Sequence, residues 1–353
     1  MRKNMFIFSL LLIILAGCVQ TKVIDNLTLI NAGGIDYIDE NNIKVTGVYT
    51  LYNEEKKAED NNITMTMNKD AGLLDHLSRE ATSPILIGDL DIIVIDMQTA
   101  KKGIYPIIDT LQREPSVGSR LYLMISEGSA HDLLMGKYGT EGNGKFISTM
   151  IETNIKHRDI PKTNLHMYAA DFFQEAKGSF LPILKKVSNE KVKIDGLAIF
   201  SKDKVVYKIP TDEMFYFKLL VDRHNKGSLD VSVEDHGATI QNIKSNSSIK
   251  TDLKKMTVDI EYNMTGIITK YTGRKLKSGI KNKITKNAEK SIEKKVLKLL
   301  TDFQEKGIDP VGIERKFIQQ HRNFDKKKWK EDYKNITFRI HSNVTISESG
   351  TLE

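Results

Sequence analysis

The apolar positions in the first half of the chain alternate between two spacings, one typical of strands and one typical of helices. Residues 90–97 form an apolar run, and residues 99–113 carry apolar side chains three and four positions apart. A second apolar run at 121–125 and another helical pattern at 130–135 follow. Strand, helix and strand at these lengths predict a βαβ unit. The other elements expected here are hairpin strands at 27–37 and 43–49, a polar loop or exposed edge at 53–70, and helices at 145–157 and 166–177.

The second half of the chain shows mainly the alternation of half-buried strands, together with one long helix. Strands are expected at 194–200, 205–209, 229–233, 256–264, 336–340 and 344–346, and a short helix is expected to begin with Thr211 as its N-cap. The long helix runs from about Lys283 to Lys306, and its single apolar face consists of Ile284, Ala288, Ile292, Val296, Leu299, Leu300 and Phe303. We therefore predict a multidomain α+β, or mixed α/β, protein. It combines an N-terminal βαβ-like unit with a C-terminal antiparallel sheet that carries a long packed helix.

Breaks in these patterns indicate the domain organisation. Gly178, Ser179 and Pro182, followed by a charged stretch at 188–191, interrupt both periodicities and predict a boundary within residues 178–193. We expect an N-terminal mixed α/β region at 18–190 and a C-terminal α+β domain at 191–353. The N-terminal region forms two domains if it divides near residues 70–84.

The first eighteen residues have the composition of a secretory signal. Arg2 and Lys3 precede a short apolar run that ends in Ala16-Gly17-Cys18. This ending resembles the lipobox of bacterial lipoproteins, which implies removal of residues 1–17 and an N-palmitoyl, S-diacylglycerol cysteine at Cys18. The apolar run is too short to span a bilayer, and two acyl chains hold a protein stably at a membrane. Cys18 is the only cysteine of the chain, so no disulfide is expected.

The net charge of +7 is unevenly distributed, because the segment 270–334 contains 20 Lys and Arg against 9 Asp and Glu. The secretory signal argues against cytoplasmic nucleic acid as the partner of this basic segment. Along the long helix a lysine ridge recurs every three or four residues: Lys283, Lys286, Lys290, Lys294 and Lys298. The ridge is a possible interaction surface for an anionic membrane or an acidic partner, and a solvated face is the alternative.

Residues capable of catalysis are present, but their arrangement does not predict an enzyme. Ser129, His131 and Asp132 are neighbours in sequence, and Ser129 is more simply the N-cap of the helix at 130–135. Asp89 and Asp91 are expected to share one face of a strand at a solvated edge. The glycine-rich loop 139–145 lacks the ending of a phosphate-binding loop and is interpreted as a flexible connector. The scattered histidines show no metal-ligand spacing, and no cofactor or metal is expected.

Several local motifs of the mature chain resemble one known family. They are Ala32-Gly33-Gly34-Ile35-Asp36-Tyr37, the strand Ile92–Ile95, the helix end Asp109–Pro115, the hairpin Asp195–Lys204, and the C-terminal series Asp309–Ile313, Phe317 and Trp329–Tyr333. With the lipobox, their order is similar to that of the Ger(x)C family, the lipoprotein (C) subunits of bacterial spore nutrient-germinant receptors. Tyr207 and Tyr333 depart from the family pattern, which commonly has Gly and Phe at these positions.

The resemblance implies a non-enzymatic subunit that is anchored by lipid to the outer face of the spore inner membrane. Such a subunit acts with two integral membrane subunits in nutrient-triggered germination, and the family is expected to have a mixed α/β fold in three domains. A solute-binding lipoprotein of a nutrient importer is the alternative. That class has two similar βαβ lobes joined by a hinge, whereas the second half of this chain has an antiparallel pattern.

Overall fold

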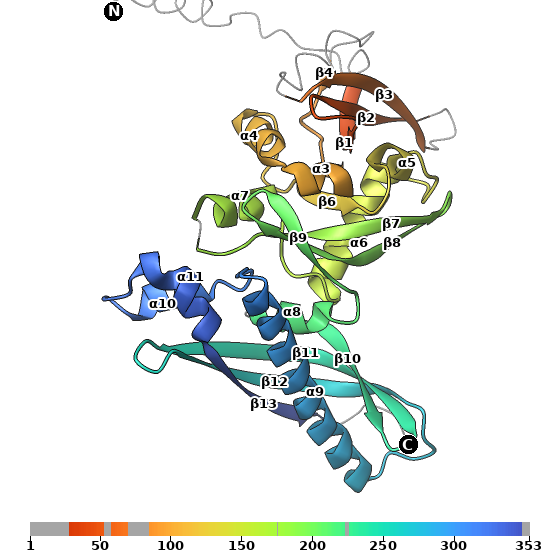
Figure 1. Cartoon of the computed structure of the whole chain (residues 1–353). Coiled ribbons are helices and arrows are strands. Elements are labelled where there is room, and N and C mark those ends of the chain that lie inside the picture. Colours follow the sequence, from red (N-terminus) through yellow and green to blue (C-terminus); the bar gives the residue numbers. More distant parts are fainter. Residues whose placement is uncertain (1–27, 53–57, 70–84, 175, 223–225, 348–353) are drawn as a thin grey trace, which may run out of the picture.

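The structure is a computed structural model that describes residues 28–52, 58–69, 85–174, 176–222 and 226–347. Two sheets lie one below the other in Figure 1, and helix α8 (Met214–Val221) is enclosed between them. The predicted division near 70–84 and the predicted signal at 1–17 lie outside the described residues.

The first sheet is mixed, with four parallel strands at its centre and antiparallel strands on both sides. Its strands, in spatial order, are β3 (Ala58–Asn68), β2 (Asn42–Tyr52), β1 (Thr28–Tyr37), β5 (Ile92–Asp96), β6 (Tyr122–Ser126), β7 (Phe180–Ser188), β8 (Lys191–Ser201) and β9 (Lys204–Ile209). The short β4 (Ile85–Leu86) pairs with the start of β1. β1, β5, β6 and β7 run parallel, which confirms the predicted βαβ unit.

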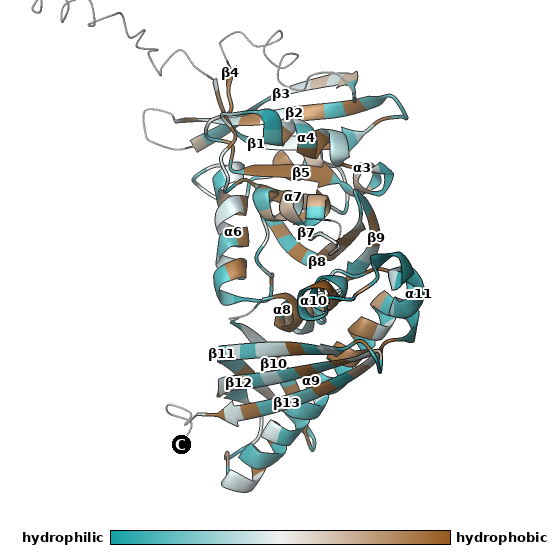
Figure 2. Cartoon of the chain, turned by 90° about the vertical axis from the view of Figure 1, so that its left-hand side faces the viewer, coloured by the Kyte–Doolittle hydropathy of each residue, from teal (hydrophilic) through white to brown (hydrophobic). Residues whose placement is uncertain are grey.

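Helices cover both faces of this sheet, as a parallel centre requires. α3 (Met97–Lys102), α4 (Tyr105–Arg113) and α7 (Leu165–Gln174) pack on the face that contains Ile93 and Ile95. α5 (Ala130–Leu134) and α6 (Asn143–His157) pack on the face that contains Ile92 and Val94. Successive side chains of β5 therefore enter opposite cores, and the strand, apolar from Ile92 to Ile95, is brown in Figure 2.

The second sheet contains β10 (Gly227–Val233), β11 (His236–Asp252), β12 (Thr257–Tyr271) and β13 (Thr337–Ile346) in that order. The long helix α9 (Ser278–Glu305) lies across one face, and every residue of its predicted apolar face is buried. α10 (Ile313–Gln320) and the short α11 (Trp329–Asp332) lie at one end of the sheet. The predicted α+β architecture is confirmed, although β13 runs parallel to β12 while the other pairs are antiparallel.

The hydrophobic core continues from the first sheet into the second without interruption. Phe180 of β7 meets Phe217 of α8 with ring centroids 5.2 Å apart. Phe217 in turn meets Phe303 of α9 at 5.9 Å. Residues Met214 to Leu220 of α8 are all buried because both sheets enclose the helix, and all of them except Lys218 are apolar or aromatic.

The structure corrects several predicted elements. The single helix expected at 99–113 is two helices, because Gly103 adopts a φ of 130° between them and Pro106 starts the second. The polar stretch at 53–70, for which a loop or an exposed edge was expected, contains the edge strand β3, so the exposed-edge interpretation is confirmed. Thr211 does not begin a helix, because α8 starts at Met214 after a turn and its N-cap position is Glu213. β11 was not predicted, and the two strands expected near the C-terminus are the single strand β13.

The segment predicted to separate the domains contains β7, which pairs with both β6 and β8. The first sheet therefore continues past residue 190 through the hairpin of β8 and β9. The glycine-rich loop at 139–145 is also more ordered than a flexible connector. The buried Asn143 accepts a hydrogen bond from the Tyr138 N–H at 3.1 Å and donates to the carbonyls of Leu134 and Gly136 at 2.9 and 2.6 Å.

Candidate functional site

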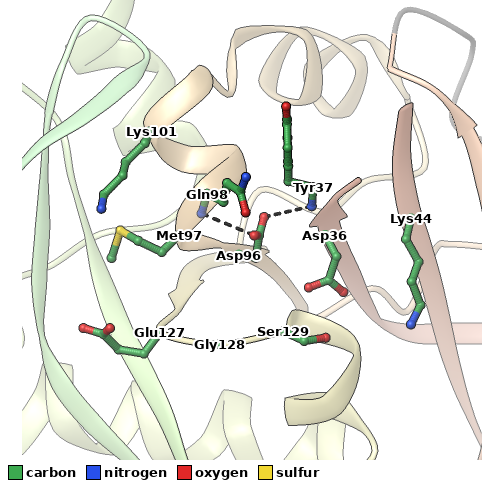
Figure 3. A pocket seen from close by; sticks show the side chains of 10 residues that line it. All are labelled: Asp36, Tyr37, Lys44, Asp96, Met97, Gln98, Lys101, Glu127, Gly128 and Ser129. Carbon is green, nitrogen blue, oxygen red and sulfur yellow. Dashed lines mark hydrogen bonds between the residues drawn. The ribbon is translucent and has the colours of Figure 1, made fainter. Parts of the chain in front are cut away.

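A crevice of about 640 Å³ opens at the carboxyl ends of β1, β5 and β6. This edge of a parallel sheet is where α/β proteins usually bind ligands. The lining residues, drawn in Figure 3, are Asp36, Tyr37, Lys44, Asp96, Met97, Gln98, Lys101, Glu127, Gly128 and Ser129. Two helix N-termini, those of α3 and α5, border this crevice, and helix N-termini attract anions.

The N-terminus of α5 is occupied by the carboxylate of Asp36, which is 8% exposed at the end of β1. Its two oxygens accept hydrogen bonds from the backbone N–H groups of Ala130 at 2.6 Å and His131 at 2.8 Å. Gly34 makes this approach possible, since a Cβ at that position would lie 2.9 Å from the Leu134 side chain of α5. The Gly-Ile-Asp-Tyr motif thus fastens α5 to the first strand.

The N-terminus of α3 is occupied in the same way by Asp96, which ends β5. Its carboxylate accepts the N–H groups of Thr99 at 3.0 Å and Gln98 at 3.3 Å. It also accepts the Tyr37 N–H at 3.2 Å, which joins the ends of β1 and β5 (Figure 3). Asp96 therefore holds two neighbouring strands and a helix together.

The N-terminus of α6 lies near the starts of β1 and β5, away from the crevice, and it is occupied by Asp60 of the edge strand β3. One oxygen of Asp60 accepts the Asn143 N–H at 2.6 Å, and the other accepts the Thr50 hydroxyl at 2.7 Å. At the crevice, carboxylates of the sheet thus fill the N-termini of α3 and α5, the kind of position at which α/β proteins hold phosphates. A phosphate approaching α3, α5 or α6 would meet a negative charge and N–H groups that already have acceptors.

The remaining charged groups of the crevice carry both signs. Glu127 forms an ion pair with Lys208 of β9, and Lys208 also binds Asp195 at 2.8 Å. Lys44 and Lys101 extend from opposite walls (Figure 3). This is a solvated, mixed-charge surface rather than an enclosed pocket with converging groups.

Ser129, His131 and Asp132 do not form a catalytic triad. The Ser129 hydroxyl accepts the Asp132 N–H at 3.1 Å, which confirms its prediction as the N-cap of α5. His131 Nδ1 lies 3.1 Å from the Thr46 hydroxyl of β2, and burial lowers the pKa of this imidazole. The histidine is therefore directed towards β2, and the Asp132 side chain is exposed.

The Asp89 and Asp91 pair lies at the opposite end of β5 from the crevice. Both residues precede the strand, so they do not share a strand face as expected. Asp89 is exposed, whereas Asp91 is half-buried and burial raises the pKa of its carboxyl. The Ser148 hydroxyl of α6 lies 3.5 Å from Asp91.

The predicted lysine ridge lies on α9, and the side chains of its five lysines are exposed. The two end members form ion pairs with other elements. Lys283 binds Glu234 at 2.5 Å, and Lys298 binds the buried Glu213 at 2.9 Å. Hydrogen bonds to Glu213 and Asp302 raise the pKa of Lys298. Lys298 is thus a structural link between α9 and the start of α8.

The C-terminal motif residues also stabilise the fold. Asp309 caps α10 by accepting the N–H groups of Gly312 and Glu314, each at 2.8 Å, and Gly312 adopts a φ of 82°. The hydroxyl of Tyr333, which the phenylalanine common at this position in the family lacks, donates a hydrogen bond to the Ile308 carbonyl at 2.9 Å. Tyr207, the other departure, donates to Asp302 at 3.2 Å.

Asp36, Asp60 and Asp96 were not singled out as site residues from the sequence. An acid at the end of an apolar run just before a helix is a recognisable N-cap signal for Asp96. No local signal indicates that Asp36 and Asp60 reach helices far along the chain.

Within the described ranges, no helix is both long and apolar enough to cross a membrane. The same residues contain no group of three or more His, Cys, Asp or Glu side chains arranged to hold a metal ion. Cys18 lies outside the described residues, and its lipidation stays a prediction.

Comparison with known proteins gives matches over nearly the whole chain. Residues 20–186 match the family described as spore germination protein, N-terminal domain, and residues 195–350 match the family described as spore germination B3/GerAC like, C-terminal. The chain is 30% identical over 360 residues to the spore germination protein GerQC of Bacillus cereus, and the match covers 99% of this chain and 100% of that protein.

Two further matches are more distant. The putative spore germination protein YfkR of Bacillus subtilis (strain 168) is 25% identical over 276 residues, which cover 74% of this chain and 71% of that protein. The crystal structure of the GerBC protein has the same fold, with a TM-score of 0.59 and 19% identity over 90% of this chain and 97% of that chain.

Proposed function

Because the chain belongs to the GerAC-like family of spore germination proteins, we propose that it is a lipid-anchored, non-enzymatic subunit of a nutrient-germinant receptor. The observation that carries the proposal is the pair of family matches, which together extend from residue 20 to residue 350. The match to GerQC supports it, because it covers 99% of this chain and 100% of that protein.

The proposed anchor is the diacylated Cys18. Its support is the lipobox sequence, in which small residues precede a single cysteine after a short apolar run. Metabolic labelling with a radioactive fatty acid tests it in the wild type, in Cys18→Ala and in the matched control Thr21→Ala. We expect label in the wild type and the control and none in Cys18→Ala. Label that persists in Cys18→Ala refutes the anchor.

The proposed absence of catalysis is supported by the crevice. Its carboxylates Asp36 and Asp96 are engaged with helix N-termini, and the Ser129 hydroxyl caps α5 instead of contacting a base. We expect the purified chain to show no turnover of ester, phosphate or peptide substrates. Turnover that is lost in Ser129→Ala would mean that the crevice is an active site.

The proposed partners are two integral membrane subunits at the outer face of the spore inner membrane. Deleting the coding sequence should abolish germination with particular nutrients, while growth and germination by non-nutrient agents stay normal. Germination that is unchanged with every nutrient tested would refute the receptor role. Slower uptake of one nutrient during growth, with germination intact, would instead identify an importer subunit.

A further inference from the structure

The middle of the lysine ridge is an exposed row of positive charge. We call Lys286, Lys290 and Lys294 the lysine stripe; each is exposed and four residues from the next. In the part of the chain that the structure describes, none of the three forms an ion pair. By contrast, the lysines beside the stripe, Lys283 and Lys298, bind acids of other elements.

The acids of α9 nearest to the stripe are engaged elsewhere. Glu293 accepts the Ser342 N–H of β13 at 3.1 Å, and Glu289 accepts the Val344 N–H at 3.0 Å. These two glutamates face the sheet edge instead of the lysines three residues before them. The stripe therefore keeps its full charge.

This arrangement opposes helix stability. Like charges four residues apart on a helix repel one another. The buried apolar face of α9 holds the helix despite this repulsion. The charge of the stripe therefore does not stabilise α9 and is available for contact with another molecule.

An apolar side chain continues the same surface. Leu297 follows Lys294 by three residues and is 42% exposed. An exposed leucine beside a row of cations fits a partner segment in which an apolar residue adjoins carboxylates.

We propose that the lysine stripe, together with Leu297, is a docking surface for an acidic segment of another protein. The choice of a protein over phospholipid follows from where the chain enters the fold. Figure 1 shows β1 and α9 at opposite ends of the molecule. The ten residues from Cys18 to Thr28 span at most about 33–36 Å, so the start of β1 lies within that distance of the bilayer and α9 lies at the other end of the molecule. This step rests on the proposed lipid anchor.

The test is photo-cross-linking in spores that carry p-benzoylphenylalanine in place of Leu297, which leaves the lysines intact. The stripe variant combines Lys286→Glu, Lys290→Glu and Lys294→Glu. The matched control reverses Lys326, Lys327 and Lys328, which are also exposed and give the same change of charge. Far-UV circular dichroism of the purified variants verifies their folding.

We expect a cross-link to an Asp- or Glu-rich peptide of a different protein. Its yield should fall about tenfold or more in the stripe variant and stay unchanged in the control. A yield that the stripe variant does not lower, adducts only with phospholipid or with a second copy of this chain, or the absence of any adduct would overturn the proposal. Fatty-acid labelling of the same spores reports the anchor separately. A missing label with an intact cross-link would refute the anchor and leave the docking surface standing.

Discussion

Replacing Asp36 with Ala should measurably destabilise the protein, because this carboxylate satisfies two backbone N–H groups at the start of α5. A hydrogen bond to a charged group contributes about 1.5–3 kcal/mol, and loss of an N-cap side chain costs about 0.5–2 kcal/mol. Water from the adjacent crevice will replace part of the lost interaction. We therefore expect a loss of about 2–3 kcal/mol in the free energy of unfolding.

The expected change in melting temperature follows from the size of the chain. An unfolding entropy of about 2.1 cal/mol/K per residue gives about 0.7 kcal/mol/K for 353 residues, so Asp36→Ala should melt about 3–4 °C below the wild type. Asp36→Asn keeps one acceptor oxygen and should lose about half as much. The assay is thermal unfolding followed by far-UV circular dichroism.

Asp132→Ala is the matched control for this series. It removes the same charge from the exposed side of the same helix, and it should cost less than about 1 kcal/mol. The reasoning fails if Asp36→Ala melts within a degree of the wild type. It also fails if Asp132→Ala and Asp36→Ala lower the melting temperature equally, because the effect would then come from charge and not from the two hydrogen bonds.

Three further predictions concern other parts of the molecule. Lys298→Glu should lower the free energy of unfolding by about 1–2 kcal/mol, because it places a second carboxylate beside the buried Glu213, whereas Lys290→Glu should change it by less than about 0.5 kcal/mol. Urea titrations compare the two variants, and equal midpoints would contradict the structural role of Lys298. Gly196→Ala should lower the free energy of unfolding by about 1–3 kcal/mol, since Gly196 has a φ of 134° and a Cβ would lie 2.3 Å from the Ile209 carbonyl oxygen. Thermal melts should show this loss and should show none in the control Gly88→Ala, where a Cβ would have no atom within 4 Å. Burial lowers the pKa of His131 from 6.5, so the unfolded chain binds the extra proton and the free energy of unfolding should fall as the pH drops below 6.5. His131→Asn should weaken this pH dependence in urea titrations, and an unchanged dependence of stability on pH would contradict the prediction.

Elements with a strong apolar period were predictable from the sequence. The apolar face of α9 was predicted residue by residue, because seven side chains at helical spacing can be buried on one side only when the segment is a helix. β11 was missed because polar residues occupy inward positions. Asn242 and Ser245 are buried, and the side-chain amide of Asn242 donates a hydrogen bond of 3.0 Å to the Ser245 hydroxyl. β7 was missed because Pro182 usually indicates a break, although here it lies within a paired strand.

The arrangement of the candidate site could not be predicted from local sequence patterns, because it rests on contacts between residues far apart in the chain. Asp36 and the N–H group that it binds are 94 residues apart, so their meeting depends on the order of strands in the sheet. The lysine ridge shows the same limit. Its spacing is visible in the sequence, but the acid that engages Lys298 lies 85 residues away. Which lysines stay unpaired is therefore a property of the fold.

The uninterrupted core between the two sheets has a mechanical consequence. Phe180, Phe217 and Phe303 interlock β7, α8 and α9, and protein interiors packed at this density have low compressibility and transmit strain. These contacts oppose bending between the two sheets, so we expect a displacement of one end to move the other end with it. A force applied at α9 is therefore expected to displace the β1 end of the molecule as well.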